Sequence, residues 1–164
     1  MALAEELCEA WKARRSMDEP LFQLVLQTQA RASGCWRLED GILQLIGFGW
    51  ANDMPDEISQ GFQAATGRVS LDQIGLGIVK AAVTKKPAVG RRDAQSSGLE
   101  GSASWIVKFA ANTSLAVPIF NDKSDSVVGV LAVSTAAFVE EGDLLWHNLI
   151  QLSKQLSQAS SMLH

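Results

Sequence analysis

Few side chains in this sequence are of the types that carry out covalent or metal chemistry. It has two cysteines, Cys8 and Cys35, and two histidines, His147 and His164. The cysteines lie in unrelated contexts, so their spacing indicates neither a disulfide framework nor a metal site, and buried free thiols are the simpler interpretation. His147 falls in a predicted helix, where a surface or interface position is expected, and His164 ends the chain. We therefore expect no metal site.

Two segments resemble nucleotide-binding loops, but neither has the residues and spacing that such a loop requires. Residues 61–68, GFQAATGR, have five residues between the glycines and an arginine where a phosphate-binding loop has lysine. Gly75-Leu76-Gly77 lacks the third glycine of the dinucleotide fingerprint. The serines of the Ser/Gly-rich stretch 96–104 have no histidine base nearby in the sequence. These patterns predict no catalytic activity.

Length, charge and hydropathy narrow the class of protein. A chain of 164 residues fits one domain that removes roughly two thirds of its unfolded surface from water. The net charge is −4, and basic residues cluster only at Arg14-Arg15, Lys85-Lys86 and Arg91-Arg92, which argues against a nucleic-acid surface. The N-terminus carries Glu5 and Glu6 where a signal peptide would be basic, and no apolar run approaches the roughly 18 residues of a membrane helix. We expect a cytoplasmic protein without a membrane partner.

Two apolar strands, residues 114–120 and 127–135, are joined by the polar turn 121–125 and form the centre of the predicted fold. The second strand is apolar at almost every position, so both of its faces must be covered, as in the middle of a sheet. Gly129 indicates a bulge or a close backbone approach, and Pro118 predicts an edge position or a bulge.

The remaining elements follow from local signals. Asp40-Gly41 between residues 35–38 and 42–50 predicts a hairpin. Apolar periodicity, capping residues and Gly/Pro breaks predict the other elements in order. They are a helix from Leu3, a helix from Asp18 to Ser33-Gly34, a helix over 56–65, a helix from Ser70 to about Lys85, a strand over 88–93, a loop over 96–101, a helix capped by Ser102 or Ser104 and ending near Asn112, and a last helix after Phe138.

The last helix has more apolar surface than one sheet face requires. Its leucines recur at spacings of four, three and four, and Trp146 and Ile150 widen the stripe. A second subunit would cover the surplus, so we expect a homodimer through the terminal helices. The predicted interface residues are Leu7, Trp11, Leu145, Leu149, Leu152 and Leu156.

Three stretches in this order resemble the GAF domain family: ASGCWRLEDGILQLIGFGW, IGLGIVKAAVTKKPAVGRRDA and SLAVPIFNDKSDSVVGVLAVST. The resemblance implies an α+β fold with a central six-stranded antiparallel sheet, the N- and C-terminal helices on one face and a ligand pocket on the other. The domain would span 18–160, after an N-terminal amphipathic helix over 1–17 and before a disordered tail over 161–164. Fold alone does not name the ligand.

The resemblance also implies which positions wall the pocket. A guanidinium from Arg91 or Arg92 would give bidentate contact with a carboxylate or phosphate, beside aromatic walls. The alternative is that the tryptophans are core residues and the arginines are solvated. The candidate ligand-binding residues are Phe48, Trp50, Arg91, Arg92, Asp93, Ser102, Ser104, Trp105, Phe109 and Ser114.

Known subfamilies fit less well. Bilin-binding members carry a Cys-His pair after the middle strand, and free methionine sulfoxide reductases of this family use pocket cysteines, but this chain has no cysteine after Cys35. No haem is expected, since His147 is the only candidate ligand within the domain. The cyclic-nucleotide motif of the family is matched only in part, by Asn121, Lys123, Phe138, Glu141 and Asp143.

The resemblance therefore implies a sensory or regulatory domain that binds a small molecule and signals through paired terminal helices to a kinase or other output protein. The start at Met1 favours a stand-alone, single-domain protein. One alternative is a ligand-free dimerisation scaffold. In a scaffold, Trp50 and Trp105 would fill the space below the sheet, whereas in a sensor they would line it. A second alternative is a divergent methionine sulfoxide reductase, disfavoured because pocket cysteines are absent.

Overall fold

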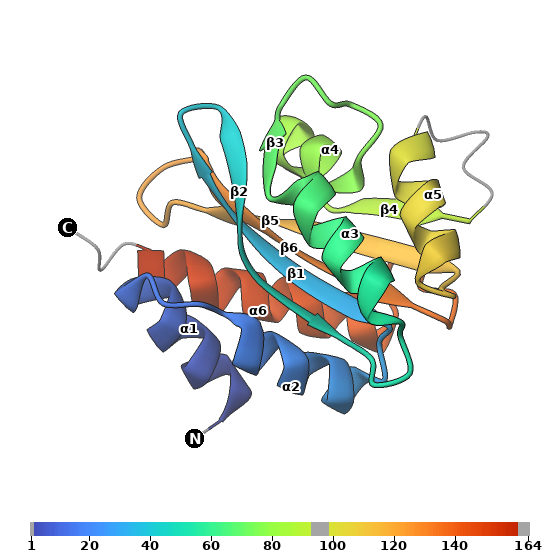
Figure 1. The fold of residues 1–164 in the computed structure, drawn as a ribbon. Helices are drawn as coiled ribbons and strands as arrows, with labels where there is room; N and C mark the ends of the chain where they lie inside the picture. Colours follow the sequence, from blue (N-terminus) through green and yellow to red (C-terminus); the bar gives the residue numbers. More distant parts are fainter. Residues whose placement is uncertain (1, 93–98, 161–164) are drawn as a thin grey trace.

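The computed structural model describes residues 2–92 and 99–160 (Figure 1). The predictions for Asp93, for residues 96–98 of the expected loop and for the tail over 161–164 lie outside these residues. The described helices are α1 (Leu3–Ala13), α2 (Asp18–Thr28), α3 (Asp56–Thr66), α4 (Gly77–Thr84), α5 (Glu100–Lys108) and α6 (Leu144–Ser160). The described strands are β1 (Ala32–Glu39), β2 (Ile42–Trp50), β3 (Arg68–Ser70), β4 (Ala88–Arg91), β5 (Thr113–Phe120) and β6 (Val127–Thr135).

The strands form one antiparallel sheet in the order β3-β2-β1-β6-β5-β4. Two hairpins, β1–β2 and β5–β6, therefore meet along the β1–β6 pair at the centre. Asp40 and Gly41 both have positive φ, 52° and 76°, as the tight turn of a two-residue hairpin requires. The predicted α+β architecture with a six-stranded antiparallel sheet is confirmed.

The two interruptions noticed in the central strands have different causes. A Cβ on Gly129 would lie 2.5 Å from the carbonyl oxygen of Trp36 and 2.7 Å from the Trp11 ring, so this glycine permits a close approach of helix α1 to the sheet. Pro118 lies beyond the end of strand β4, whose last pair with β5 is Ala88 with Ala116. Its missing N–H is tolerated there, as expected for an edge position.

The helices form a layer on each face of the sheet (Figure 1). Helices α1, α2 and α6 cover one face, and their largest buried side chains, Leu7, Trp11, Leu21, Leu149 and Leu156, share one core with strands β5 and β6. Helices α3, α4 and α5 cover the other face. The terminal helices therefore lie together on one side, as the sequence resemblance implied.

The apolar stripe on α6 is used inside the chain. Leu7, Trp11, Leu149 and Leu156 are each 0–1 % exposed, while Leu145 and Leu152 pack against the same core from its margin. Periodicity alone does not report how much of this stripe the sheet and α1 cover, and the homodimer itself stays a prediction. These six side chains therefore do not require a second subunit to explain them.

Several predicted boundaries were wrong where pairing between strands outweighs local signals. Helix α2 ends at Thr28, and Ser33-Gly34, expected to stop it, lie inside β1, where the Ser33 hydroxyl donates to the carbonyl of Ala132. The helix expected from Ser70 begins at Gly77, because Ser70 pairs with Ile42 in the sheet. Helix α5 begins at Glu100, so neither Ser102 nor Ser104 is its N-cap.

Among the residues described, none of the helices is both long enough and apolar enough to span a bilayer.

Replacing Leu149 by alanine is expected to lower the free energy of unfolding by about 2–5 kcal/mol, because it leaves a cavity in the core beneath α6. The matched control is Leu144→Ala on the same helix, where the side chain is 76 % exposed and the change should stay below about 0.5 kcal/mol. Urea unfolding followed by circular dichroism measures both. Equal effects would contradict the assignment of Leu149 to the core of a single chain.

Candidate functional site

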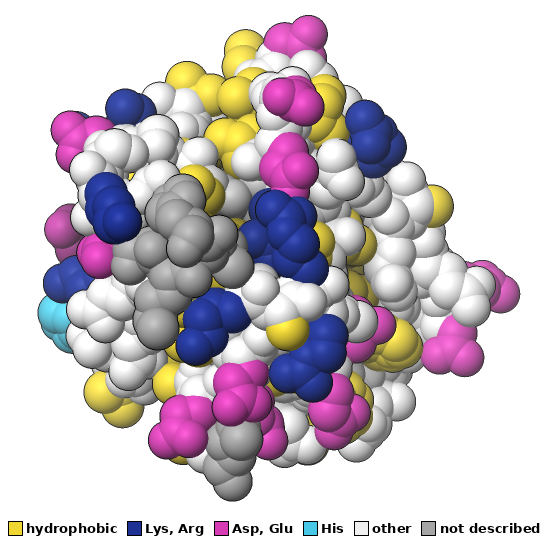
Figure 2. Space-filling model, turned by 90° about the vertical axis from the view of Figure 1, so that its left-hand side faces the viewer, with side chains coloured by type: hydrophobic (Ala, Val, Ile, Leu, Met, Phe, Trp, Pro, Cys, Tyr) yellow, Lys and Arg dark blue, Asp and Glu magenta, His cyan; other side chains and the backbone are white. Residues whose placement is uncertain are grey.

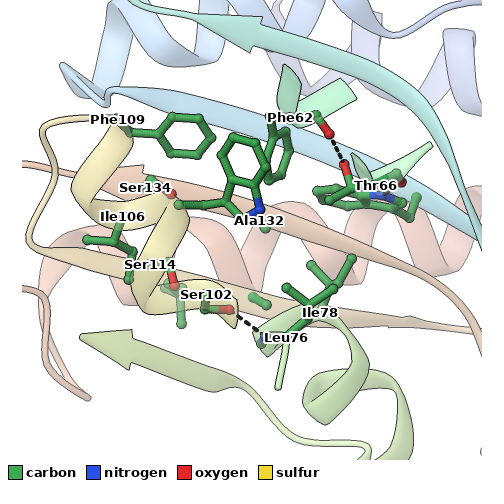
Figure 3. Close-up of a pocket in the computed structure, with 15 residues that line it drawn as sticks. Phe62, Thr66, Leu76, Ile78, Ser102, Ile106, Phe109, Ser114, Ala132 and Ser134 are labelled. Atoms are coloured by element: carbon green, nitrogen blue, oxygen red, sulfur yellow. Dashed lines mark hydrogen bonds between the residues drawn. The ribbon is translucent and has the colours of Figure 1, made fainter. Parts of the chain in front are cut away.

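A small cavity lies between the sheet and the layer formed by α3, α4 and α5 (Figure 3). Its volume is about 50 Å³. Strands β5 and β6 line one side, and side chains from α3, α4, α5 and the segment before α4 line the other. The lining includes Trp36, Phe62, Thr66, Leu76, Ile78, Ser102, Trp105, Ile106, Phe109, Ser114, Ala116, Ala132 and Ser134.

The sheet contributes unusually small side chains to this face. Two neighbouring rows of paired residues cross β4, β5, β6 and β1, and their register places all members on the same side. We call these eight residues the small-residue patch. They are Gly90, Ser114, Ser134 and Ala32 in one row, and Ala88, Ala116, Ala132 and Gly34 in the other.

Gly90 is needed for the patch to have this shape. A Cβ at this position would lie 2.6 Å from the hydroxyl oxygen of Ser114 and 3.4 Å from the Cβ of Ser102. Its absence lets the Ser114 side chain and helix α5 approach β4. The glycine therefore sets the width of the cavity at its β4 side.

Aromatic side chains from α3, from α5 and the residue that follows it, and from β2 pack beside the small-residue patch. Phe62 of α3 is the hub, with its ring centroid 5.0 Å from those of Phe48 and Phe109 and 5.1 Å from that of Trp105. The contacts of Phe62 with Trp105 and Phe109 are edge-to-face, the arrangement favoured by ring quadrupoles. Trp50 stacks on Phe48 at 5.7 Å. We call these five residues the aromatic cluster.

The cavity left between patch and cluster is small for an organic ligand. Pockets that enclose such ligands span about 300–1,000 Å³, whereas about 50 Å³ holds only a few water molecules. Trp105 is half-buried, and the ammonium of Lys108 lies 4.2 Å from the centroid of its ring. In this conformation the tryptophan therefore both lines the cavity and occupies most of the space beside it.

Two hydroxyls supply the cavity's uncommitted polar groups. Ser114 and Ser134 are paired across β5 and β6 and both line the cavity. Within the described residues neither hydroxyl has a hydrogen-bond partner, and neither oxygen is sealed off from solvent. Among the described residues that line this cavity, none has a charged side chain. The site is therefore suited to a neutral molecule with one or two hydrogen-bonding groups.

Ser102 connects two helices at the mouth of the cavity. Its hydroxyl oxygen accepts a hydrogen bond from the N–H of Gly77, the first residue of α4, at 2.7 Å (Figure 3). That N–H is one of the groups that a helix start leaves unsatisfied. Ser102 therefore fixes the distance between α4 and α5, and its oxygen is already engaged.

The predicted ligand-binding residues divide into two groups. Ser102, Trp105, Phe109 and Ser114 line the cavity, and Phe48 and Trp50 lie behind it in the aromatic cluster. The others do not line the cavity. These are Arg91, whose guanidinium lies 3.4 Å from the carbonyl oxygen of Val139, Arg92, which is exposed, and Ser104, which is exposed. Arg91 follows Gly90 on β4, and successive side chains of a strand point to opposite faces, so Arg91 is turned away from the small-residue patch.

Sequence reasoning missed Phe62 and most of the small-residue patch. A usable signal was present: in SLAVP and VLAVS, the small residues Ser114, Ala116, Ala132 and Ser134 alternate with large ones. Alternate residues share a face of a strand, so this pattern marks a face left open for other side chains or a ligand. Phe62 had no such signal, because its contacts all come from other elements.

The two thiols and the His147 imidazole do not line this cavity. Cys35 is fully buried on the opposite face of the sheet, among the residues beneath α1, α2 and α6, and burial raises the pKa of its thiol to about 12. Cys8 lies on α1, where burial also raises the pKa of its thiol. His147 is exposed on α6. Within residues 2–92 and 99–160, no group of three or more His, Cys, Asp or Glu side chains is arranged to hold a metal ion.

A scan against models of protein families and a search of curated proteins found no match for this sequence. Solved structures, in contrast, resemble the chain over nearly its full length. The GAF domain region of a Geobacter sulfurreducens protein is 18 % identical, with a TM-score of 0.65, over 89 % of this chain and 91 % of that one. The nlh2 GAF domain of A. aeolicus, solved in an inactive state, is 13 % identical, with a TM-score of 0.65, over 99 % and 95 %.

A third similar structure belongs to an enzyme. The type II free methionine-R-sulfoxide reductase of Thermoplasma acidophilum is 17 % identical, with a TM-score of 0.59, over 96 % of each chain. Identities this low describe the fold and not the activity. The sheet order, the terminal helices on one face and these likenesses agree with the motifs in the sequence, and the chain has a GAF-like fold.

Proposed function

We propose that this chain is a sensory or regulatory GAF-type domain whose ligand is a small neutral molecule. The observation that carries the proposal is the small-residue patch, with its two uncommitted hydroxyls, facing an aromatic cluster. Aromatic walls with a few convergent polar groups are typical of sites for small organic ligands. The lack of charged side chains among the described lining residues disfavours the carboxylate or phosphate ligand that Arg91 or Arg92 would have held.

Ligand entry requires Trp105 to move, and helix α5 is the element best able to let it. Over its nine residues α5 buries only Ile106, with Leu99 and Phe109 buried just outside it. Elements with few buried apolar contacts open at the lowest free energy. We infer that the ligand replaces the Trp105 ring against Phe62 and Phe109.

Occupancy would reach the terminal helices through strand β5. Ser114 and Ala116 face the cavity, while the alternate residues Leu115 and Val117 belong to the core beneath α6. The N–H of Phe120 also donates to the hydroxyl of Ser157 on α6, at 3.0 Å. A shift of β5 therefore changes the packing of α6, from which an output protein would read the signal.

One observation favours a second candidate, a ligand-free scaffold. The described cavity of about 50 Å³ shows the aromatic cluster filling the space that a ligand would use. In that case the cluster is a core, and the function belongs to the outer surfaces of the helices.

Native mass spectrometry of gently purified protein separates the two candidates. For a sensor we expect an adduct in the low hundreds of daltons, or binding of a neutral aromatic probe such as indole. Ser114→Ala should weaken that binding roughly three- to tenfold, because it removes one neutral hydrogen bond. Ser104→Ala, the same change at an exposed serine of α5, should leave it unchanged. Bare protein that binds neither indole nor a wider panel of neutral probes would favour the scaffold.

The structure also makes a prediction about the reductase alternative. The thiol of Cys35 is fully buried, and its pKa is raised to about 12. In a Cys8→Ser variant, which leaves Cys35 as the one thiol of the sequence, a disulfide reagent should therefore react only after unfolding. No thiol-dependent reduction of free methionine sulfoxide is expected, since a thiolate is required. Turnover that Cys35→Ser abolishes would show that the thiol reaches substrate.

The raised pKa of Cys35 also predicts a dependence of stability on pH. The folded chain keeps the thiol proton between pH 9.0 and about 12, while the unfolded chain loses it, so the free energy of unfolding should fall as pH rises through this window. Urea unfolding at pH 8 and pH 10.5 measures the fall, and it should be smaller in Cys35→Ala. The sequence has no tyrosine to titrate in the same range. Equal falls in both proteins would contradict the burial of Cys35.

A further inference from the structure

A larger hollow lies on the other side of the sheet, between the α1–α2 connection and the β1–β2 hairpin. Its volume is about 260 Å³, and its lining is polar. In Figure 2, which views the molecule from the left-hand side of Figure 1, several Lys and Arg side chains gather near the middle. We call it the arginine hollow, and its lining residues are Arg14, Arg15, Ser16, Arg37, Glu39, Gln44 and Ile46.

Arg37 is held rigidly at the base of the arginine hollow. Arg37 is only 7 % exposed, and its guanidinium lies 4.0 Å from the centroid of the Trp11 ring. Its Nη2 donates to the carbonyl of Trp11 at 2.8 Å. Its Nε lies 4.0 Å from Glu39 Oε1, too far for a hydrogen bond. The planar fork is therefore fixed in place while part of its donor set stays free for a ligand.

Positive charge in the hollow exceeds negative charge. Among the described lining residues, three arginines accompany one carboxylate, that of Glu39, whose Oε1 already accepts a hydrogen bond from Arg14 Nη1 at 2.9 Å. Burial, and next the nearby charge of Arg14, lowers the pKa of the Arg37 guanidinium. An anion placed here would relieve that repulsion.

The sheet register extends the cationic row beyond the hollow. Arg37 of β1 pairs with Gln44 of β2, and Gln44 pairs with Arg68 of β3. Paired residues of neighbouring strands share a face, so these three side chains lie in one row. Gln44 contributes an uncharged amide between the two guanidinium groups, and Arg68 is exposed.

We propose that the arginine hollow binds a small dianion, either a phosphate group or a dicarboxylate. Guanidinium forks match both of these groups with two parallel hydrogen bonds. The hollow's size fits a small molecule, and the chain's net charge of −4 disfavours a nucleic-acid polyanion. Since Arg14 and Arg15 come from the α1–α2 connection and Arg37 comes from the sheet, the bound anion ties the N-terminal helices to the β1–β2 hairpin.

Titration calorimetry at low salt tests this with inorganic pyrophosphate and, in parallel, malonate. Binding of the first alone identifies phosphate chemistry, and binding of the second alone identifies dicarboxylate chemistry. Arg15→Gln should weaken binding about tenfold, because it removes one charge-assisted contact. Arg68→Gln should weaken it less, because Arg68 lies beside the hollow. Both side chains are exposed, and circular dichroism checks that the variants fold.

The matched control is Lys80→Gln on α4, which removes one exposed positive charge from the opposite face. It should leave binding unchanged. The absence of binding by either anion would overturn the proposal, as would equal losses in Arg15→Gln and Lys80→Gln. Salt-dependent binding of duplex DNA that is lost in Arg15→Gln, without binding of either anion, would overturn it in favour of a nucleic-acid surface.

Discussion

The contact of Trp11 with Gly129 holds the two ends of the chain on one face of the sheet. Because Gly129 has no side chain, the Trp11 ring of α1 can lie directly on the central strand β6. The indole N–H donates to the Ser160 hydroxyl at the end of α6, and Arg37 stacks on the ring and bonds to the Trp11 carbonyl. One buried indole therefore joins the first helix, the last helix and the middle of the sheet.

The two faces of the sheet are packed by opposite rules. Beneath α1, α2 and α6 the strands contribute large apolar side chains such as Leu115, Val117 and Leu131, which interdigitate with the helices. Beneath α3, α4 and α5 the strands contribute the small-residue patch, and the bulk comes from aromatic side chains above it. The first arrangement fixes structure. In the second, much of the bulk comes from the aromatic cluster rather than from the small-residue patch.

Strand β1 places the two candidate sites back to back. Trp36 lines the cavity beneath α3 to α5, and the next residue, Arg37, lies at the base of the arginine hollow. Because successive side chains of a strand point to opposite faces, one short segment contacts both sites. An anion that orders the α1–α2 connection and a neutral ligand that moves α5 would act on the same pair of hairpins.

The sequence alone determined the order of elements, the two hairpins and the central position of β6, because these follow from local turn chemistry and from apolar runs. It also placed Ser102, Trp105, Phe109 and Ser114 near the cavity through family resemblance. Only the tertiary structure decided what required packing between distant segments. It used the α6 stripe inside the chain, left Arg91 and Arg92 outside the cavity, and brought Arg37 beside Arg14 and Arg15. Local patterns report which face of an element is apolar, but the partner of that face is chosen by the whole fold.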